Sequence, residues 1–404
     1  MNPVVEYIKT RKVGCSIILC NVLLLILNVG AIYYYLPWIV SGVQNKVQII
    51  RQGDMKDWSR PGLSSEYFVK IKEISIEEMF SEKTGLWWPT AILADAMERC
   101  HEIFGISNDL DYLIKFYDSY IDHTGSFRTP GTTKYLGNMM HGNTLIYLEQ
   151  ITGRTKYSKT IEELYASLMS YRRTRSGIIP YREKHSELVL VDSLGMICPF
   201  LARYGKIYGK QQATRMAVLQ IVAFINHGVD PVTGLPYHGY ISESKEHVGI
   251  LGWGRGTGWY LYGLVGILEY LPVENSHRGQ MIAALERLAE SLHNHQNPDG
   301  SWSWSITNPY ARKETSGTAM IAYAIEKAIG LRLLSQEYYQ MLDKAHNALM
   351  AETTEKGFLI GASGDCGGIG RYSQHYGHNS WVQGATTAFN ALLLNRNHSV
   401  NRTK

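Results

Sequence analysis

Six short turns that contain glycine divide most of this chain into segments of comparable length. In each turn a Thr, Ser, Asp or Lys precedes the glycine, and aromatic residues or a short extended piece usually follow. The glycines are Gly85, Gly125, Gly177, Gly234, Gly300 and Gly357. Glycine adopts positive φ at little cost, which favours it at such turns. One such turn is weak evidence, but six at intervals of 40 to 66 residues indicate a structural repeat.

Two helical patterns fit between each turn and the next. The pairs are 89–104 with 109–121, 139–151 with 156–173, 193–208 with 211–226, 256–270 with 277–295, and 316–331 with 336–351. One more helix is expected near 64–80 and one near 380–395. Twelve helices in six hairpins predict an all-α fold, a closed (α/α)6 toroid. An open helical solenoid is the alternative, although its repeats would be more even in length.

The N-terminal region has a different composition. Residues 13–40 carry no charge, and aromatic residues gather at the end of this stretch, as in a membrane-spanning helix. We therefore expect a cytoplasmic tail (1–12), a transmembrane anchor (13–40), a linker (41–61) and a toroidal domain (62–404). Lys9, Arg11 and Lys12 precede the span closely, which favours a cytoplasmic N-terminus and a domain outside the cytoplasm. The lipid bilayer is the expected partner of this helix.

Charge and cysteine content exclude several classes. The formal net charge is only +4 and no basic block stands out, so nucleic acid is not an expected partner. The five cysteines are scattered and show neither a disulfide framework nor a metal-ligand spacing. His375 and His378 are three residues apart, but two histidines without a nearby acid are a weak metal signal. We expect no metal and no cofactor.

The toroid predicts where side chains of distant segments meet. Its inner helices begin just after the glycine turns, so their N-termini gather around one funnel mouth, where helix dipoles favour anions. The polar and aromatic residues expected there are Trp87, Trp88, Asn138, His141, Asp192, Trp253, Arg255, Lys313, Glu314, His375 and His378, with Arg182, His238, Trp302 and Trp304 from the turns. Acids, bases and tryptophan platforms for a sugar would converge at this mouth.

Asp192 is the most informative of these residues, because it is the only acid in the apolar run after Glu187. Burying a carboxylate without partners is costly, so the position needs an explanation. One interpretation is a helix cap that accepts a backbone hydrogen bond. The other is a catalytic acid whose apolar neighbours raise its pKa. The position alone leaves both open.

The glycine-rich segment 252–264, GWGRGTGWYLYGL, invites a nucleotide-binding interpretation. The GxGxxG spacing and the βαβ context are missing, so we reject it. The segment instead fits a close-packed start of an inner helix, with Arg255 and Trp259 facing the funnel. An arginine fork suits a sugar carboxylate. His238 could donate to a substrate or simply pack, and the Trp302–Trp304 pair could be a sugar platform or packing.

Four segments carry a resemblance to a known family: VDSLGMICPFLARYG, GLPYHGY, GWGRGTGWYLYGLV and ETSGTAMIAYAI, in this order. The chain resembles the unsaturated uronyl hydrolases of glycoside hydrolase families 88 and 105, especially the unsaturated rhamnogalacturonyl hydrolase type. The resemblance extends over roughly 85–394. It implies an (α/α)6 fold, in agreement with the repeat count, and an oligosaccharide or polysaccharide as substrate.

The resemblance also implies a chemistry. In this family an aspartic acid protonates C4 of a 4,5-unsaturated uronic acid at the non-reducing end and helps water attack C5; the hemiketal then collapses and releases the sugar. Asp192 matches the catalytic position, and His238, Arg255 and Trp259 match positions that contact substrate. With the other residues expected at the mouth, the predicted substrate-binding set is Asn138, His141, His238, Trp253, Arg255, Trp259 and Trp302.

One departure from the family leaves alternatives open. Relatives usually carry a second acid just before the third helix, where this chain reads YLGNMMHGN, with Asn138 or His141 in its place. An amide can hold a water or a hydroxyl group but cannot exchange a proton. Besides a membrane-anchored hydrolase of unsaturated uronates, two readings therefore remain. One is another acidic-glycan-processing enzyme on the same toroid, and the other is a non-catalytic glycan-binding or assembly protein.

Overall fold

Twelve α-helices make up most of the part of the chain that the computed structural model describes, which is residues 65–81, 85–308 and 310–402. They are α2 (Ser65–Met79), α3 (Trp88–Phe104), α4 (Ser107–Tyr120), α5 (His141–Thr152), α6 (Ser158–Ser170), α7 (Asp192–Ile207), α8 (Gln211–His227), α9 (Gly254–Tyr270), α10 (Arg278–Asn294), α11 (Thr315–Gly330), α12 (Tyr339–Ala351) and α13 (Ser380–Arg402). All twelve predicted helices are confirmed. Their boundaries agree within three residues, except that α13 runs on to Arg402.

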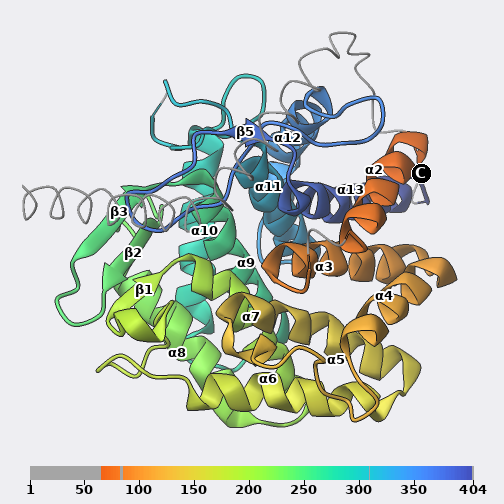
Figure 1. Ribbon diagram of the computed structural model, residues 1–404. Helices are drawn as coiled ribbons and strands as arrows, with labels where there is room; N and C mark the ends of the chain where they lie inside the picture. The colour runs from red at the N-terminus through yellow and green to blue at the C-terminus, as the bar shows by residue number, and fades with distance from the viewer. Residues whose placement is uncertain (1–64, 82–84, 309, 403–404) are drawn as a thin grey trace, which may run out of the picture. The chain divides into compact units, whose positions relative to one another are not determined.

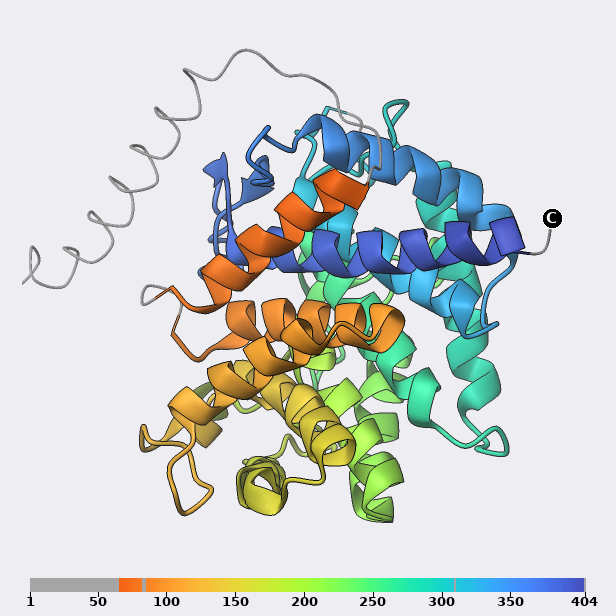
Figure 2. The same cartoon turned by 90° about the vertical axis from the view of Figure 1, so that its right-hand side faces the viewer.

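The helices form two concentric layers. The odd-numbered helices α3, α5, α7, α9, α11 and α13 pack in this order as an inner ring, and α13 packs against α3 to close it. The even-numbered helices lie outside, each against neighbouring inner helices. Figures 1 and 2 show this closure, with the orange helix α3 beside the blue helix α13, although they lie at opposite ends of the described sequence. The predicted (α/α)6 toroid is confirmed, and the open solenoid is not observed.

Short strands lie between the helices on the side where the inner helices begin. The strands β1 (Leu188–Leu190), β2 (Tyr237–Ile241) and β3 (His247–Leu251) form one antiparallel sheet in the order β1–β2–β3. The strands β4 (Ala362–Ser363) and β5 (Tyr376–Gly377) form a second, two-stranded sheet. Strand β1 leads directly into α7, and its residue Leu190 pairs with Gly239 of β2. This register places β2 beside the first turn of α7.

Glycines allow the inner helices to approach closely. A Cβ atom on Gly263 of α9 would lie only 2.8 Å from the backbone carbon of Leu194 on α7. This contact explains the glycines of segment 252–264, as expected for a close-packed inner helix. The inner helices are mostly buried all round; in α9 every residue from Gly254 to Leu268 is buried. A site can therefore form only where the ring opens at its ends.

No helix within the described ranges is both long and apolar enough to cross a membrane. The expected tail, anchor and linker (1–61) lie outside the described residues.

Candidate active site

A cavity of about 140 Å³ lies at the N-terminal end of α7. Three separate parts of the chain form its wall: the segment that leads into β1 and α7, strand β2, and the loop between β4 and β5. The lining residues are Tyr181, Arg182, His185, Leu188, Leu190, Asp192, His238, Cys366, Gly367, Gly368, Ile369 and Arg371. Asp192 is the only carboxylate among these lining residues.

Asp192 is the first residue of α7, and its side chain keeps 12% of its surface exposed. Val191 occupies the N-cap position, and no side-chain capping hydrogen bond forms there. The Oδ2 atom of Asp192 is fully buried and accepts no hydrogen bond of good geometry from the described residues, although it lies 3.2 Å from Nε2 of His238. The structure therefore gives no support to the capping interpretation of Asp192.

Strand β2 brings His238 to Asp192. The Val191 amide donates to the His238 carbonyl over 2.8 Å, which fixes the strand against the start of the helix. The imidazole is 2% exposed and its ring centroid lies 4.7 Å from that of Trp253. Its other nitrogen, Nδ1, lies 2.7 Å from the Tyr372 hydroxyl. His238 thus stands between the acid and a tyrosine of the β4–β5 loop.

Three basic side chains, Arg182, His185 and Arg371, line the rest of the cavity wall together with apolar ones, and all three are exposed. The Arg182 guanidinium lies over the ring of Tyr181. Burial raises the pKa of the nearby Asp365, and the charge of Arg182 opposes that shift. Burial, with a smaller contribution from the charge of Asp192, raises the pKa of the Cys366 thiol to about 11 and that of Tyr372 to about 12. Both groups are therefore protonated near neutral pH and add no negative charge beside Arg182 and Arg371, whose positive charges suit an anionic ligand.

Arg255 does not face the funnel as expected. Its guanidinium is buried and donates to the Ser363 carbonyl and hydroxyl, both at 2.8 Å, and to the Gly364 carbonyl at 2.9 Å. It also lies over the rings of Trp253 and Trp381. The physical reason is that the acceptors within its reach belong to the β4 segment and, at 3.4 Å, to the Ser316 hydroxyl of α11. Arg255 anchors the start of the loop that carries Cys366 and Arg371.

The two residues at the position of the missing acid are buried. His141 has no exposed surface; its nitrogens lie 3.0 Å from the Tyr117 hydroxyl and 3.2 Å from the Trp87 carbonyl, and burial lowers its pKa to about 3. Asn138 donates to the Thr132 carbonyl at 2.8 Å, and its Oδ1 is buried without a partner among the described residues. Neither residue lines the cavity of Asp192.

The predicted tryptophans also lie in the core. Trp253, Trp259 and Trp302 are at most 2% exposed, and the Trp302 indole donates to the Leu292 carbonyl. Trp259 packs edge-on against Trp88, whose ring lies tilted against that of Trp381, with centroids 4.9 Å apart. None of these rings lines the cavity of Asp192.

Sequence reasoning missed several residues of the site. Arg371, on the cavity wall, and Tyr372, beside His238, lie far from Asp192 in the chain, in a glycine-rich loop between the last outer and the last inner helix. Tyr181 and His185 lie in the irregular segment before β1. The one available signal was the run GDCGGIGRYSQHYG, because glycine-rich segments next to inner-helix starts supply mouth residues elsewhere in this chain.

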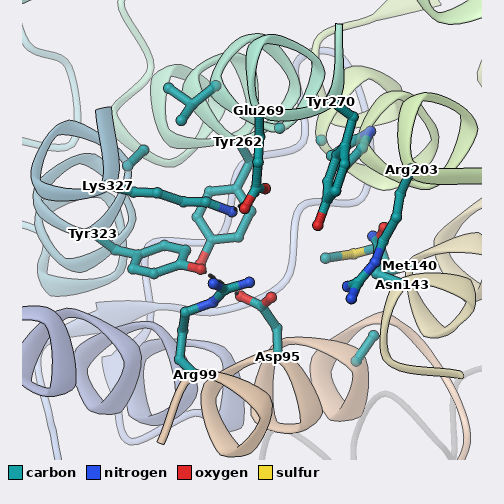
Figure 3. Close-up of a pocket in the computed structure, with 16 residues that line it drawn as sticks. Asp95, Arg99, Met140, Asn143, Arg203, Tyr262, Glu269, Tyr270, Tyr323 and Lys327 are labelled. Carbon is teal, nitrogen blue, oxygen red and sulfur yellow. Dashed lines mark hydrogen bonds and ion pairs between the residues drawn. The ribbon is translucent and has the colours of Figure 1, made fainter. Parts of the chain in front are cut away.

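A second cavity lies on the axis of the ring and is smaller, about 40 Å³. Figure 3 shows charged side chains and tyrosines of the inner helices pointing toward one another there. Lys327 pairs with Glu269 at 2.7 Å, Arg203 pairs with Glu98 at 2.5 Å, and the Tyr323 hydroxyl donates to Asp95 at 3.0 Å. This volume holds a few water molecules at most. The mouth cavity is therefore the candidate active site.

The toroid and a mouth cavity with one acid beside a histidine define the class: a glycoside hydrolase of the (α/α)6 type. The model of glycosyl hydrolase family 88 matches residues 64–392, which is most of the chain. The chain belongs to this family, as its resemblance to the unsaturated uronyl hydrolases predicted.

Individual relatives agree with the family. The unsaturated rhamnogalacturonyl hydrolase YesR of Bacillus subtilis is 27% identical over 193 residues, which cover 46% of this chain but only 55% of that protein. A possible member of the GH105 family from Klebsiella pneumoniae has a TM-score of 0.75 at 21% identity, covering 84% of this chain and 96% of its own. The unsaturated glucuronyl hydrolase of Bacillus sp. GL1, responsible for the degradation of glycosaminoglycan, has a TM-score of 0.62 at 16% identity, covering 81% and 96%. These structures share the fold.

Proposed function

We propose that this protein hydrates the 4,5-double bond of an unsaturated uronic acid at the non-reducing end of an oligosaccharide. One observation carries the proposal: the mouth cavity holds a single acid, Asp192, among basic side chains. An acid that exchanges a proton and a cationic wall that holds a sugar carboxylate are what this reaction needs. The named activities of YesR and of the Bacillus sp. GL1 enzyme support the same substrate class.

The residues take the following parts in the proposed reaction. Asp192 gives a proton to C4, water adds to C5, and a proton of that water returns to Asp192, so the acid is regenerated. The hemiketal formed at C5 opens and releases the remaining sugar. Arg182, with Arg371 and His185, faces the carboxylate of the substrate. His238 holds the acid from its buried side.

The full-length protein, in detergent, should consume unsaturated oligosaccharides made by polysaccharide lyases. The measurement is the ultraviolet absorbance of the conjugated double bond, with the released sugar followed separately. Asp192→Asn should abolish the decay. Asp122→Asn is the matched control, because Asp122 only accepts hydrogen bonds from Thr124 and Ser126 in a turn, and it should leave the rate unchanged.

Asn138 favours a second candidate, a glycan-binding or assembly protein without turnover. It replaces an acid that relatives use, and its Oδ1 has no partner among the described residues. Saturable binding of the unsaturated oligosaccharide without decay of its absorbance would favour this candidate over the hydrolase. Release of sugar from intact acidic glycans, with no decay of the absorbance of the unsaturated oligosaccharides, would identify a different enzyme on the same toroid.

The protein is also proposed to be anchored by residues 13–40, with its N-terminus in the cytoplasm and its toroidal domain outside. The uncharged length of this segment and the basic residues before it support the assignment. The full chain should remain in the membrane fraction after high-salt and alkaline washes. Because the domain is proposed to be periplasmic or lumenal, protease added to the non-cytoplasmic side of the membrane, in spheroplasts or opened vesicles, should digest it. Release by either wash would overturn the anchor, and protection of the domain there would overturn the orientation.

A further inference from the structure

His238 has a different neighbour at each of its two ring nitrogens. Nε2 lies 3.2 Å from Oδ2 of Asp192, and Nδ1 lies 2.7 Å from the hydroxyl oxygen of Tyr372. The ring itself is held between Trp253 and Tyr372, whose centroids lie 4.7 Å and 5.3 Å away. A neutral imidazole carries one proton, so only one of the two nitrogens can donate. The position of this proton therefore decides whether Asp192 faces an N–H donor or an unprotonated ring nitrogen.

The acceptor beside Nε2 indicates the direction. An ionised carboxylate can only accept, so Nε2, which lies 3.2 Å from Oδ2 of Asp192, is the nitrogen that carries the proton of a neutral ring. Nδ1 is then the acceptor, and the Tyr372 hydroxyl donates to it over 2.7 Å. The backbone amide of Ile250 donates to the Tyr372 oxygen over 3.3 Å, which leaves the phenol proton available for Nδ1.

We infer that Tyr372 is a positioning residue that fixes the tautomer of His238 so that its Nε2–H faces Asp192. The inference rests on the proposed function for its role in the reaction. With Oδ2 buried and opposed by an N–H donor, Oδ1 is the oxygen left to exchange a proton with substrate. The present Nε2–Oδ2 contact is not yet a well-aligned hydrogen bond, and such contacts commonly tighten when substrate binds.

The surrounding structure holds Tyr372 in this place. Its ring packs against Trp253 and Trp304, with centroids 5.6 Å and 5.4 Å away. The Gly364 amide donates to the His375 carbonyl at 2.9 Å, which closes the loop that contains Tyr372. Arg255 fixes the start of this loop, as described above. The loop that supplies Arg371 to the cavity wall therefore also sets the proton on His238.

Other titratable groups near His238 come from each packed element. Asp192 comes from α7, Tyr181 and Arg182 from the segment before β1, and Asp365 and Cys366 from the loop. Burial raises the pKa of Tyr181 and of Cys366, so both side chains are protonated near neutral pH. A tautomer measurement at one pH therefore tests Tyr372 against a constant background.

Nitrogen NMR of the full-length protein, labelled in its histidine rings, measures the tautomer directly. The His238 signals are assigned by their loss in His238→Gln. Wild type should show Nε2 protonated and Nδ1 unprotonated, and Tyr372→Phe should shift the population toward the Nδ1–H form. Tyr376→Phe is the matched control, since Tyr376 follows the loop directly, in β5, but packs on Arg312. An Nδ1–H form in wild type, or no change in Tyr372→Phe, would overturn the inference.

Kinetics test the role in the reaction separately. Tyr372→Phe should lower kcat about 10–100-fold, the range for partners that orient a functional side chain, with little change in KM. The amide of His238→Gln can donate to Asp192 without needing a tautomer. Tyr372→Phe should therefore add no further loss in that background, whereas additive losses would contradict the inference. If wild type shows no turnover at all, the proposed function fails, and the NMR result still decides where the proton lies.

Discussion

The two cavities of the toroid treat their charged groups in opposite ways. On the axis, the charged groups have close partners: Lys327 meets Glu269, Arg203 meets Glu98, and Asp95 meets the Tyr323 hydroxyl, although one atom each of Glu98, Arg99 and Arg203 stays buried without a hydrogen bond among the described residues. At the mouth, the one close polar contact of the Asp192 carboxylate within the described part of the chain is Nε2 of His238. A matched buried network stiffens a structure, whereas an acid left without a firm partner costs stability and remains available for chemistry. The difference separates the structural charges from the functional one.

The direction of the inner helices contributes to this difference. Lys327 lies in the last turn of α11, where the helix dipole favours a cation. Asp192 lies at the N-terminal end of α7, where the dipole favours an anion. The helix dipoles therefore favour the cation Lys327 of the axial cluster and an anionic ligand or acid at the mouth.

The largest effect is expected from Asp192→Asn. Loss of a general acid should lower kcat by about 10³-fold, because the amide cannot transfer a proton. The free energy of unfolding should stay within about 1 kcal/mol of wild type or rise, since the carboxylate has no firm partner to lose. Steady-state kinetics and urea unfolding of the same preparation check both. A marked loss of stability would mean that Asp192 is a structural charge like those of the axial cluster, and the difference between the two cavities would not hold.

Arg203→Met should have the opposite effect: a large loss of stability and little change in kcat. It leaves the buried Glu98 with only the more distant Arg99, 3.9 Å away, as counter-ion, and breaking a buried pair costs up to about 3–5 kcal/mol of unfolding free energy. Urea unfolding measures the loss, while kcat of the folded fraction at low temperature should change little. Glu98→Gln combined with Arg203→Met removes the weakly paired charge and should restore part of the stability. A normal stability but a large loss of kcat would mean that the axial cluster takes part in catalysis.

Gly249→Ala tests how tightly the mouth is built around His238. Gly249 has φ of +79°, and a Cβ there would lie 2.6 Å from Cβ of His238 and 2.8 Å from the Tyr372 hydroxyl. Backbone strain alone should cost about 1–2 kcal/mol of stability. Gly209→Ala is the matched control, since Gly209 has φ of +65° and nothing within 4 Å. Both should lose similar stability, but only Gly249→Ala should also lower kcat. Equal kinetics in the two variants would show that the mouth tolerates displacement of His238.

The sequence predicts the architecture well and the site only in part. Helical periodicity and glycine turns are local signals, so the twelve helices and the ring could be found without coordinates. The pairing of Asp192 with His238 follows from the order of elements at the mouth. The partners of Arg255 and the position of Tyr372 depend on how the β4–β5 loop crosses the mouth, which no local pattern encodes. Asp95 and Arg99 were missed because a charged pair at helical spacing is typical of a solvated face.

Glu102, which pairs with Arg99 beside the axial cluster, is expected to give the smallest effect. It tests whether burial or ion pairing determines the pKa of an acid there. Burial raises its pKa from 4.5 to about 7, against the opposing charge of Arg99, with which it pairs. Between these pH values the folded protein holds a proton that the unfolded chain has released, so stability should fall as pH rises through the window. Because 31% of the side chain is exposed, solvent will keep the effect small. The measurement is the unfolding free energy of wild type minus that of Glu102→Gln from pH 4.5 to 7, which should decline. A difference that grows with pH would mean that the pairing with Arg99 outweighs burial, and that the matching of charges on the axis extends to its rim.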